Sequence, residues 1–228
     1  MIGVVVPAND EEALIGRCLE ALSVAAKHPD LRGEPVHVLV VLDSCRDRTA
    51  QIVQAHGVAS LEVEVRNVGA ARAAGAAAAI EVGARWLAFS DADSAVDPDW
   101  LVRQLAPQAD AVCGVVTVDD WSGCSMQARM AYEAAYVDAD HHRHIHGASL
   151  GVSTDAYLRV GGFPPLRCSE DVALVHRLGE SGARIHWTNK VRVRTSARRV
   201  ARAPEGFAKY VDDLHQAAIA HLPRVESA

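Results

Sequence analysis

The sequence predicts an α/β fold, namely a Rossmann-like, doubly wound and mostly parallel sheet with helices on both faces. Up to Phe89, short apolar runs of strand length alternate with segments whose apolar residues recur at helical spacing, in the order strand, helix, strand, helix, strand, helix, strand. Pro7, Asp43 and Asp91 stand at or just beyond the ends of three of these runs. Because ligands of such sheets bind beyond the carboxyl ends of the strands, we expect three loops to converge on one cleft.

The first half of the chain contains the clearest elements. Continuous runs of valine, isoleucine and leucine indicate strands that are buried on both faces, and Pro7 is expected to stop the first of them. A strict alternation at residues 61–65 indicates an edge strand, and residues 9–12 supply N-capping and acidic residues for a helix. The predicted strands are 2–6, 36–42, 61–65 and 86–89, and the predicted helices end near residues 26, 56 and 82.

The second half is less regular. It shows no repeat, no low-complexity linker and no boundary between domains, so we predict one domain over residues 1–228. A Gly-Gly-Phe-Pro-Pro turn at residues 161–165 separates two helical segments. The predicted helices are 97–105, 126–140, 154–160, 172–179 and 204–221, and the predicted strands are 111–118, 147–152, 184–187 and 190–194.

Composition argues against several classes of protein. The net charge of −6 over 228 residues disfavours general nucleic-acid binding, which requires a basic face, although basic residues at 190–202 suit an anionic ligand. No apolar run reaches the ~18 residues of a membrane span, and we expect no secretory leader. Five scattered cysteines without CxxC spacing disfavour a disulfide framework or a structural zinc site, so we expect a cytoplasmic protein.

The segment Asp91-Ala92-Asp93 follows the apolar run at residues 86–89, at the point where a strand would leave the sheet. Two carboxylates this close repel each other, and a hard divalent cation between them removes the repulsion. Mg²⁺ or Mn²⁺ bound by one or two carboxylates, with water and phosphate oxygens in its other positions, commonly accompanies a diphosphate. The alternative is an acidic loop that caps a helix begun by Pro98.

Two other loops carry candidate ligand-binding residues. Asp43 can accept a hydrogen bond from the imide N–H of a nucleobase, with Ser44 beside it, or it can cap the next helix. Gly69 permits close approach of another backbone, and Arg72 places a positive charge where phosphates would lie. This loop matches neither the Walker pattern nor GxGxxG, so it is a weak signal when taken alone.

Glu170 and Asp171 stand at the start of a predicted helix, where the helix dipole favours acidic side chains. An ionised carboxylate in a cleft can serve as the general base for a hydroxyl nucleophile. The alternative interpretation is a pair of capping residues.

The segment 141–146 is rich in histidine, and His142 and His146 stand at helical i, i+4 spacing. No HExxH pattern accompanies them, so we expect a solvated helix end that borders the cleft rather than a metal site. His186 is a minor candidate for a third metal ligand beside the two aspartates.

Taken together, these segments resemble the family-2 glycosyltransferases of GT-A fold. That family opens with a strand followed by Pro-x-x-Asn-Glu-Glu, and Pro7-Ala8-Asn9-Asp10-Glu11-Glu12 is similar to it, with Asp10 in place of an asparagine. The match covers about residues 1–202, and the order of its segments makes it specific. The other matching segments are Asp43 to Thr49, Asn67-Val68-Gly69 with Arg72, Asp91-Ala92-Asp93, Gly147-Ala148-Ser149, Gly161-Gly162-Phe163, Glu170-Asp171 and Thr195-Ser196-Ala197-Arg198-Arg199.

The resemblance implies a metal-dependent enzyme that binds a nucleotide-diphosphate sugar, with UDP favoured and GDP as the other option. Asp93 and Asp91 would bind Mn²⁺ or Mg²⁺, and Asp171 beside Glu170 would deprotonate an acceptor hydroxyl in an inverting displacement. The implied donor-binding residues are Pro7, Ala8, Glu11, Asp43, Ser44, Gly69, Arg72, Asp91, Ala92, Asp93, Arg198 and Arg199, and the implied acceptor-binding residues are Gly147, Ala148 and Ser149.

The resemblance also divides the predicted domain into a nucleotide-sugar-binding half at residues 1–95, an acceptor and catalytic half at 96–203, and a C-terminal helix at 204–228. Ser149 replaces the usual asparagine of the acceptor segment. The Gln-x-x-Arg-Trp motif of processive synthases is missing, so we expect transfer of a single sugar to a soluble or membrane-surface acceptor. A homodimer is compatible with the sequence.

Three other functions stay open at this point. A sugar-nucleotide nucleotidyltransferase would carry a glycine-rich phosphate loop with Arg or Lys after the first strand, whereas residues 7–12 are acidic. A non-catalytic nucleotide-sugar-binding domain would not need Asp93 and Asp171. A metal hydrolase would have to be built on the histidines at residues 141–146.

Overall fold

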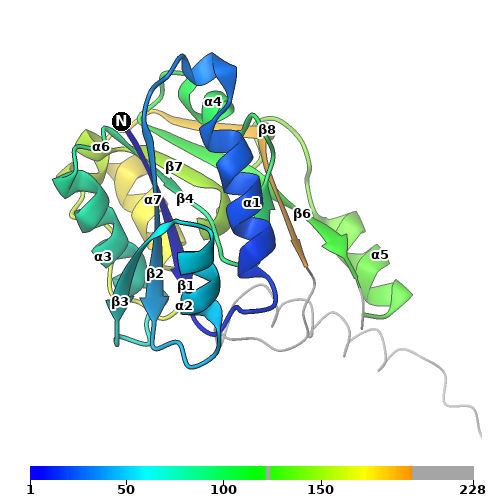
Figure 1. The fold of residues 1–228 in the computed structure, drawn as a ribbon. Helices are drawn as coiled ribbons and strands as arrows, with labels where there is room; N and C mark the ends of the chain where they lie inside the picture. Colours follow the sequence, from blue (N-terminus) through cyan, green and yellow to red (C-terminus); the bar gives the residue numbers. More distant parts are fainter. Residues whose placement is uncertain (122–123, 197–228) are drawn as a thin grey trace, which may run out of the picture. The chain divides into compact units, whose positions relative to one another are not determined.

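The computed structural model describes residues 1–121 and 124–196, and Figure 1 labels their elements. An eight-stranded sheet in the order β3-β2-β1-β4-β7-β6-β8-β5 runs through them. The strands are β1 (Ile2–Ala8), β2 (Val36–Asp43), β3 (Ala59–Val63), β4 (Trp86–Phe89), β5 (Ser94–Val96), β6 (Ala111–Asp120), β7 (Leu150–Ser153) and β8 (Ile185–Ser196). The helices are α1 (Ile15–Ala26), α2 (Thr49–Ala55), α3 (Val68–Glu81), α4 (Trp100–Leu105), α5 (Met126–Ala135), α6 (Thr154–Arg159) and α7 (Glu170–Glu180), with 3₁₀ turns η1 (Pro29–Leu31) and η2 (Gly147–Ser149).

Strand β1 lies inside the parallel part of the sheet, between β2 and β4. It pairs with β2 from Ile2 opposite Val36 to Ala8 opposite Leu42, and with β4 on its other side. Strand β2 also pairs in parallel with β3, which lies at the edge as its alternating sequence predicts. The pairs β4–β7, β6–β7 and β5–β8 are antiparallel. The predicted α/β fold is confirmed, and the loops that follow the four parallel strands emerge at one edge (Figure 1).

Helices cover both faces of the sheet, and neighbouring residues of one strand enter different cores. Val4 and Val6 pack in the core formed with α1, α2 and α4, whereas Val5 packs in the core formed with α3, α6 and α7. The same alternation separates Trp86 from Leu87 in β4. Because these strands are buried on both faces, their sequences are continuous apolar runs rather than alternating ones.

Gly75 lets α3 pack closely against the sheet. A Cβ atom at this position would lie 2.4 Å from Cγ1 of Val5 and 2.7 Å from Cγ2 of Val41. Gly75 therefore serves helix–sheet packing, and α3 in turn carries Arg72 to the edge of the sheet.

The substitution Gly75→Ala is expected to lower the free energy of unfolding by about 1–3 kcal/mol, because the added methyl group overpacks the contact between α3 and the sheet. Gly16→Ala in α1 is the matched control, since a Cβ atom there meets only the His56 ring at 3.9 Å. Alanine is favoured over glycine within a helix by up to about 1 kcal/mol, so the control should be stabilised. Urea unfolding of both variants measures the difference, and a stabilised Gly75→Ala would contradict the packing argument.

Three strands of the second half differ from the prediction. The sequence separates residues 184–187 from 190–194, but β8 is continuous, because Thr188 is buried and donates its hydroxyl hydrogen bond to Asp140 Oδ1 at 2.7 Å. Strand β5 was not predicted, since it has three residues and is defined by its pairing with β8, Ser94 opposite Thr195. The strand predicted at residues 147–152 begins only at Leu150.

The ends of several other elements also differ from the prediction, and β3 spans Ala59–Val63 instead of residues 61–65. Pro7 does not stop β1, which continues to Ala8. Helix α1 begins at Ile15 rather than near residue 9, because Asp10 has a left-handed backbone conformation with φ of 52°. Helix α5 ends at Ala135, where the extended conformation of Tyr136 stops it. The predicted helix at 204–221 and the arginines at 198 and 199 lie outside the described residues.

The chain forms two compact units. The larger one comprises residues 1–117 and 138–195 and contains every described residue of the candidate site. In the smaller unit, the Tyr132 ring packs against Trp121 and Tyr136, with ring centroids 5.4 and 5.3 Å away. Among the helices of residues 1–121 and 124–196, none combines the length and the apolar character that crossing a membrane requires.

Candidate functional site

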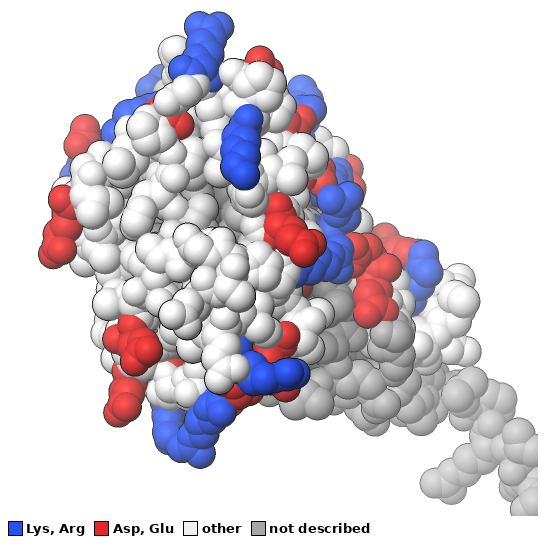
Figure 2. Space-filling model, in the orientation of Figure 1, with Lys and Arg blue, Asp and Glu red and all other residues white. Residues whose placement is uncertain are grey.

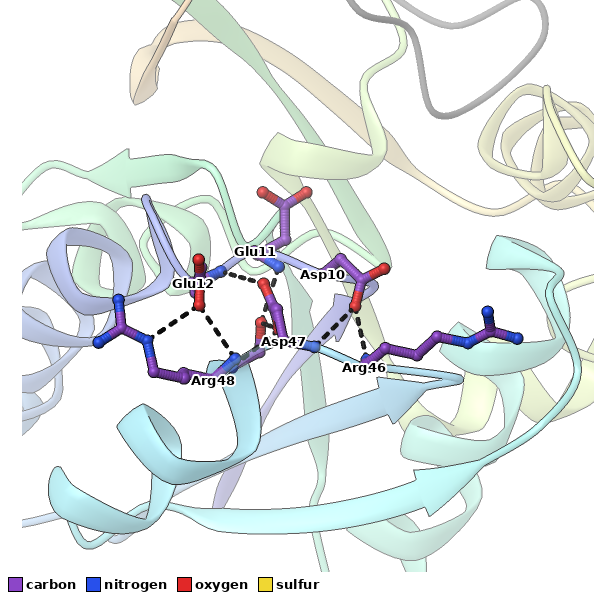
Figure 3. A network of polar contacts seen from close by, with 7 residues as sticks. Asp10, Glu11, Glu12, Arg46, Asp47 and Arg48 are labelled. Carbon is purple, nitrogen blue, oxygen red and sulfur yellow. Dashed lines mark hydrogen bonds and ion pairs between the residues drawn. The ribbon is translucent and has the colours of Figure 1, made fainter.

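Hydrogen bonds join the loop after β1 to the loop after β2 at the carboxyl edge of the parallel strands (Figure 3). Oδ1 of Asp10 accepts from the backbone N–H groups of Arg46 and Asp47, at 2.6 and 3.2 Å. Oδ2 of Asp47 accepts from the backbone N–H of Glu12 at 2.9 Å, and Oε2 of Glu12 accepts from Nε of Arg48 at 3.1 Å. These acidic side chains therefore hold the two loops together instead of capping α1.

Glu11 differs from its two acidic neighbours, because its carboxylate points away from this network (Figure 3). The residue is buried, and its backbone N–H donates to the Thr49 hydroxyl at 2.7 Å. Burial raises the pKa of the Cys18 thiol in α1, and the carboxylates of Asp93, Asp91 and Glu11 raise that pKa further. Acidic side chains from the loops after β1 and β4 are thus close enough to act on one thiol.

The aspartates after β4 supply oxygen ligands of the kind that Mg²⁺ and Mn²⁺ prefer. Asp93 is half-buried and accepts from the Ser94 hydroxyl at 3.0 Å, while Oδ1 of Asp91 contacts Arg72. Within residues 1–121 and 124–196, no group of three or more His, Cys, Asp or Glu side chains is arranged to hold a metal ion. Two aspartates alone would leave the other positions of such a cation to water and phosphate oxygens.

Asp43, at the end of β2, organises the loop after β3. Its Oδ1 atom accepts from the backbone N–H groups of Val65 and Arg66, at 2.9 and 2.8 Å, and from the Ser44 hydroxyl at 3.0 Å. Its Oδ2 atom accepts from the backbone N–H of Asn67 at 3.0 Å. The residue is buried, so its first role is structural, and Oδ2 is the atom with the greater remaining capacity to accept a hydrogen bond.

Arg72 is buried, with only 4% of its side chain exposed. Its Nη2 group is paired with Asp91 and its Nη1 group with Glu170, which lies at the start of α7. Burial alone would lower the pKa of Arg72, but Asp91 and Glu170 hold that pKa above its usual value. Burial also raises the pKa of Glu170, against the opposing effect of Arg72. Both terminal nitrogens of Arg72 therefore meet carboxylates, and a contact of Arg72 with donor phosphates stays a prediction.

Asp171 is half-buried beside this cluster and links α7 to η2. Its Oδ2 atom accepts from the backbone N–H of Gly147 at 2.6 Å, and its Oδ1 atom accepts from the backbone N–H of Val172 at 2.8 Å. A Cβ atom on Gly147 would lie 2.5 Å from Nη2 of Arg72, so only glycine leaves room for the guanidinium. The structure thus brings together Asp91, Gly147 and the adjacent pair Glu170 and Asp171, which come from three segments distant in sequence.

Gly69 makes room for a neighbouring loop rather than for a ligand. A Cβ atom at this position would lie 2.2 Å from the carbonyl oxygen of Pro164 and 2.8 Å from that of Leu166. The Gly69 N–H donates to the latter oxygen at 3.0 Å, and the Asn67 amide donates to the carbonyl of Pro165 at 3.0 Å. We therefore assign Gly69 to the packing of α3 against the segment before α7.

Several residues of the sequence-based site have buried side chains. Ala8, Ala92 and Ala148 are part of the core. Ser149 is fully buried, and its hydroxyl donates to the carbonyl oxygen of Val191 at 3.5 Å. Among residues 147–149, the side chain of Ser149 is therefore not available to a ligand, and their acceptor-binding role stays a prediction.

The histidine segment is not helical, which corrects the expectation based on i, i+4 spacing. The rings of His142, His144 and His146 stack in series at i, i+2 spacing, with centroids 5.5 and 5.8 Å apart. The Trp187 ring packs edge-on against His142 at 5.9 Å. These stacked rings directly precede Gly147 in the chain.

We expect His146→Gln to reduce the loss of stability on acidification. Burial lowers the pKa of His146 to about 4, with smaller contributions from His144 and His142. The unfolded chain, with a histidine pKa of about 6.5, binds this proton first, so stability is lost as pH falls from about 6.5 towards 4, by up to about 1.4 kcal/mol per pH unit. Urea unfolding across this range should show a flatter profile for His146→Gln, whereas His176→Gln, an exposed control on α7, should follow the wild type.

The described part of the basic segment at residues 190–202 is neutralised. Lys190, Arg192 and Arg194 of β8 pair with Asp140, Asp138 and Asp97, at 3.8, 2.7 and 3.3 Å respectively. On the face shown in Figure 2, the coloured acidic and basic residues are also interspersed. The described residues therefore do not support the expected anion-binding patch, and the arginines at 198, 199 and 202 lie outside them.

His186 is not supported as a third metal ligand. It lies in β8, and no group of three or more His, Cys, Asp or Glu side chains that could hold a metal ion occurs within residues 1–121 and 124–196.

A family model described as glycosyltransferase like family 2 matches residues 1–213. The chain belongs to this family. Among curated proteins, none matches the sequence.

Solved structures show the same fold. TarS residues 1–349 from S. aureus, in complex with UDP-GlcNAc, share 16% identity and a TM-score of 0.67, over 97% of this chain and 67% of that one. A longer TarS structure has a TM-score of 0.66 at 16% identity, and it matches over 93% of this chain, which spans 42% of that protein. The fold of this family-2 glycosyltransferase chain is therefore GT-A.

Two further similar structures are complexes that contain Mn²⁺. The mannosyltransferase PcManGT from Pyrobaculum calidifontis, in complex with GDP-Man and Mn²⁺, has a TM-score of 0.64 at 19% identity, over 100% of this chain and 76% of that one. Glucosyl-3-phosphoglycerate synthase from Mycobacterium tuberculosis, in complex with Mn²⁺, UDP and phosphoglyceric acid, has a TM-score of 0.64 at 20% identity, over 99% and 80%.

Sequence reasoning missed the contacts that define the centre of the site. The Arg72–Glu170 pair joins residues 98 positions apart, and no local pattern indicates that pairing. No sequence pattern singles out Cys18, yet its thiol donates to the Asp91 carbonyl at 3.4 Å. The single available signal was Gly147, since a glycine at the end of a polar segment often marks the close approach of another group.

Proposed function

We propose that this chain transfers one sugar from a nucleotide-diphosphate sugar to an acceptor hydroxyl. The observation that carries the proposal is the cluster at the carboxyl edge of the sheet. There Asp91, which follows β4, and Glu170 at the start of α7 pair with the same guanidinium, and Asp171 lies next to them. Asp91, which we expect on the donor side, and Asp171, the candidate base, therefore lie close together, as a transfer reaction requires.

A uridine nucleotide is the donor that we favour, and a guanosine nucleotide is the other option. Oδ2 of Asp43 can accept a hydrogen bond from the imide N–H that both bases carry. The structural neighbours include complexes with UDP-GlcNAc, UDP and GDP-Man, which supports a nucleotide-sugar donor without distinguishing the base.

Asp93, with the free side of Asp91, would hold Mn²⁺ or Mg²⁺ against the donor diphosphate. Oδ1 of Asp91 is engaged by Arg72, so Asp93 is the principal protein ligand in this proposal. The acidic surroundings of Cys18, formed by Asp93, Asp91 and Glu11, favour a cation at this place. Such a cation neutralises the charge of the departing nucleotide diphosphate.

Asp171 would act as the general base. It would take the proton of the acceptor hydroxyl while that oxygen attacks the anomeric carbon and the bond from this carbon to the diphosphate oxygen breaks, which inverts the configuration. The N–H groups of Gly147 and Val172 hold the two carboxylate oxygens and so fix the orientation of the side chain. Glu170 pairs with Arg72, so it would support the base rather than replace it.

A thermal-shift panel tests the proposal most directly. UDP-glucose, UDP-GlcNAc and GDP-mannose are added with and without Mn²⁺, since a ligand that binds only the folded state raises the melting temperature. A Mn²⁺-dependent shift with one nucleotide identifies the donor. No shift with any of the three at millimolar concentration would contradict the proposed function.

A further inference from the structure

Arg72 is the most constrained charged residue of the site. Its two terminal nitrogens pair with carboxylates from two different elements, and its Nε atom has no hydrogen-bond partner among the described residues. The centre of its guanidinium lies 5.9 Å from the centroid of the Phe163 ring, and its edge lies against Gly147. Each terminal nitrogen thus directs one N–H group at a carboxylate, and the two carboxylates come from different elements.

The stability of the fold does not explain this arrangement. Burying a guanidinium and a carboxylate costs several kcal/mol per ion, and apolar residues of similar volume often replace such pairs without loss. The unsatisfied Nε adds to the cost. The geometry, in contrast, is specific, because a planar guanidinium sets the separation of the two carboxylates that it joins.

We propose that Arg72 is a positioning residue that sets the location of the base-bearing end of α7 relative to the aspartates after β4. It holds Asp91 with one nitrogen and Glu170 with the other, and Asp171 follows Glu170 directly. The role rests on the proposed transfer reaction, in which the reacting groups must be held within a fraction of an ångström. Arg72 acts through its two partners and does not contact the substrate.

The test separates positioning from donor binding by measuring two quantities. Donor affinity is measured by calorimetry with Mn²⁺ and the nucleotide sugar that binds the wild type, and turnover is measured as release of nucleoside diphosphate with water as the acceptor. The double variant Arg72→Met with Glu170→Leu removes both buried charges, so it should fold. We expect its donor Kd to stay within about threefold of the wild type, while kcat falls about 100-fold.

Arg72→Lys provides the conservative variant. An ammonium group keeps the charge but cannot bridge two carboxylates with fixed geometry, so we expect kcat to fall about tenfold at unchanged donor Kd. Should the double variant fail to fold, Arg72→Lys and Glu170→Gln carry the same comparison. The matched control is Arg85→Met with Glu34→Leu, which removes a pair of 2.6 Å at the amino end of β4 and should leave kcat unchanged.

The possible failures are distinguishable. A folded double variant with wild-type kcat would overturn the positioning role, and so would a large rise in donor Kd at unchanged kcat, since that result would make Arg72 a donor ligand. If the wild type neither binds nor cleaves any of the three nucleotide sugars, the proposed function itself fails, and the role of Arg72 falls with it.

Discussion

Asp171→Asn is expected to lower the turnover of a nucleotide sugar by about 10²–10⁴-fold, because general-base catalysis contributes a factor of this size. Asparagine cannot take a proton, and its amide would also turn an N–H group towards one of the two backbone N–H donors that now bind the carboxylate. The donor does not depend on this side chain, so its Kd should stay within about threefold of the wild-type value. Calorimetry and release of nucleoside diphosphate measure the two quantities.

Asp155→Asn is the control for this experiment. Asp155 also lies in the first turn of a helix, α6, so the control removes a comparable acidic group and its interaction with the helix dipole. Its turnover should equal that of the wild type. Wild-type turnover by Asp171→Asn would show that another group is the base, and Glu170 would be the first residue to examine.

Asp93→Ala is expected to abolish the Mn²⁺-dependent binding of the donor. At a donor concentration of 100 times Kd, binding adds about 2.7 kcal/mol to the free energy of unfolding, which raises the melting temperature of a chain of this size by roughly 5–10 °C. This shift should disappear in the variant, while the melting temperature without ligand should stay close to that of the wild type, because Asp93 is half-buried and lies outside the two large cores.

Asp99→Ala controls for the loss of a nearby acidic group. Asp99 precedes α4 and accepts from Nε of Arg103 on the surface, so its removal should preserve the shift produced by donor and Mn²⁺. A full shift with Asp93→Ala would mean that the aspartates after β4 do not hold the cation. A shift that is equal with and without Mn²⁺ in the wild type would contradict metal dependence itself.

The parallel half of the fold was predictable because of how its strands are buried. Strand β4 is covered by helices on both faces, so residues 86–89 had to form a continuous apolar run, and that run can be recognised in the sequence. Strand β5 has three residues and little apolar signal of its own. Strand β8 passes through Thr188, whose hydroxyl donates to Asp140 and accepts from the backbone N–H of Lys190. Such elements depend on distant partners, so local patterns did not identify them.

The edge at which the loops after the parallel strands emerge was predictable for a similar reason. Parallel strands place the residues that follow them at one edge, and β2 and β4, which precede Ser44 and Asp91, both pair in parallel with β1. The order of the short motifs along the chain then indicated the glycosyltransferase family, to which the chain belongs.

The contacts of the individual side chains required the folded chain. The sequence predicts a small-residue loop at Gly69 and Arg72, whereas both residues lie in α3. Glu170 and the Pro164 carbonyl, which occupy the space around them, come from the second half of the chain. The carboxylate of Asp43 likewise accepts three backbone hydrogen bonds from the loop after β3. Local patterns follow from burial and backbone periodicity, whereas the partner of a buried charge depends on which distant segments the sheet brings together.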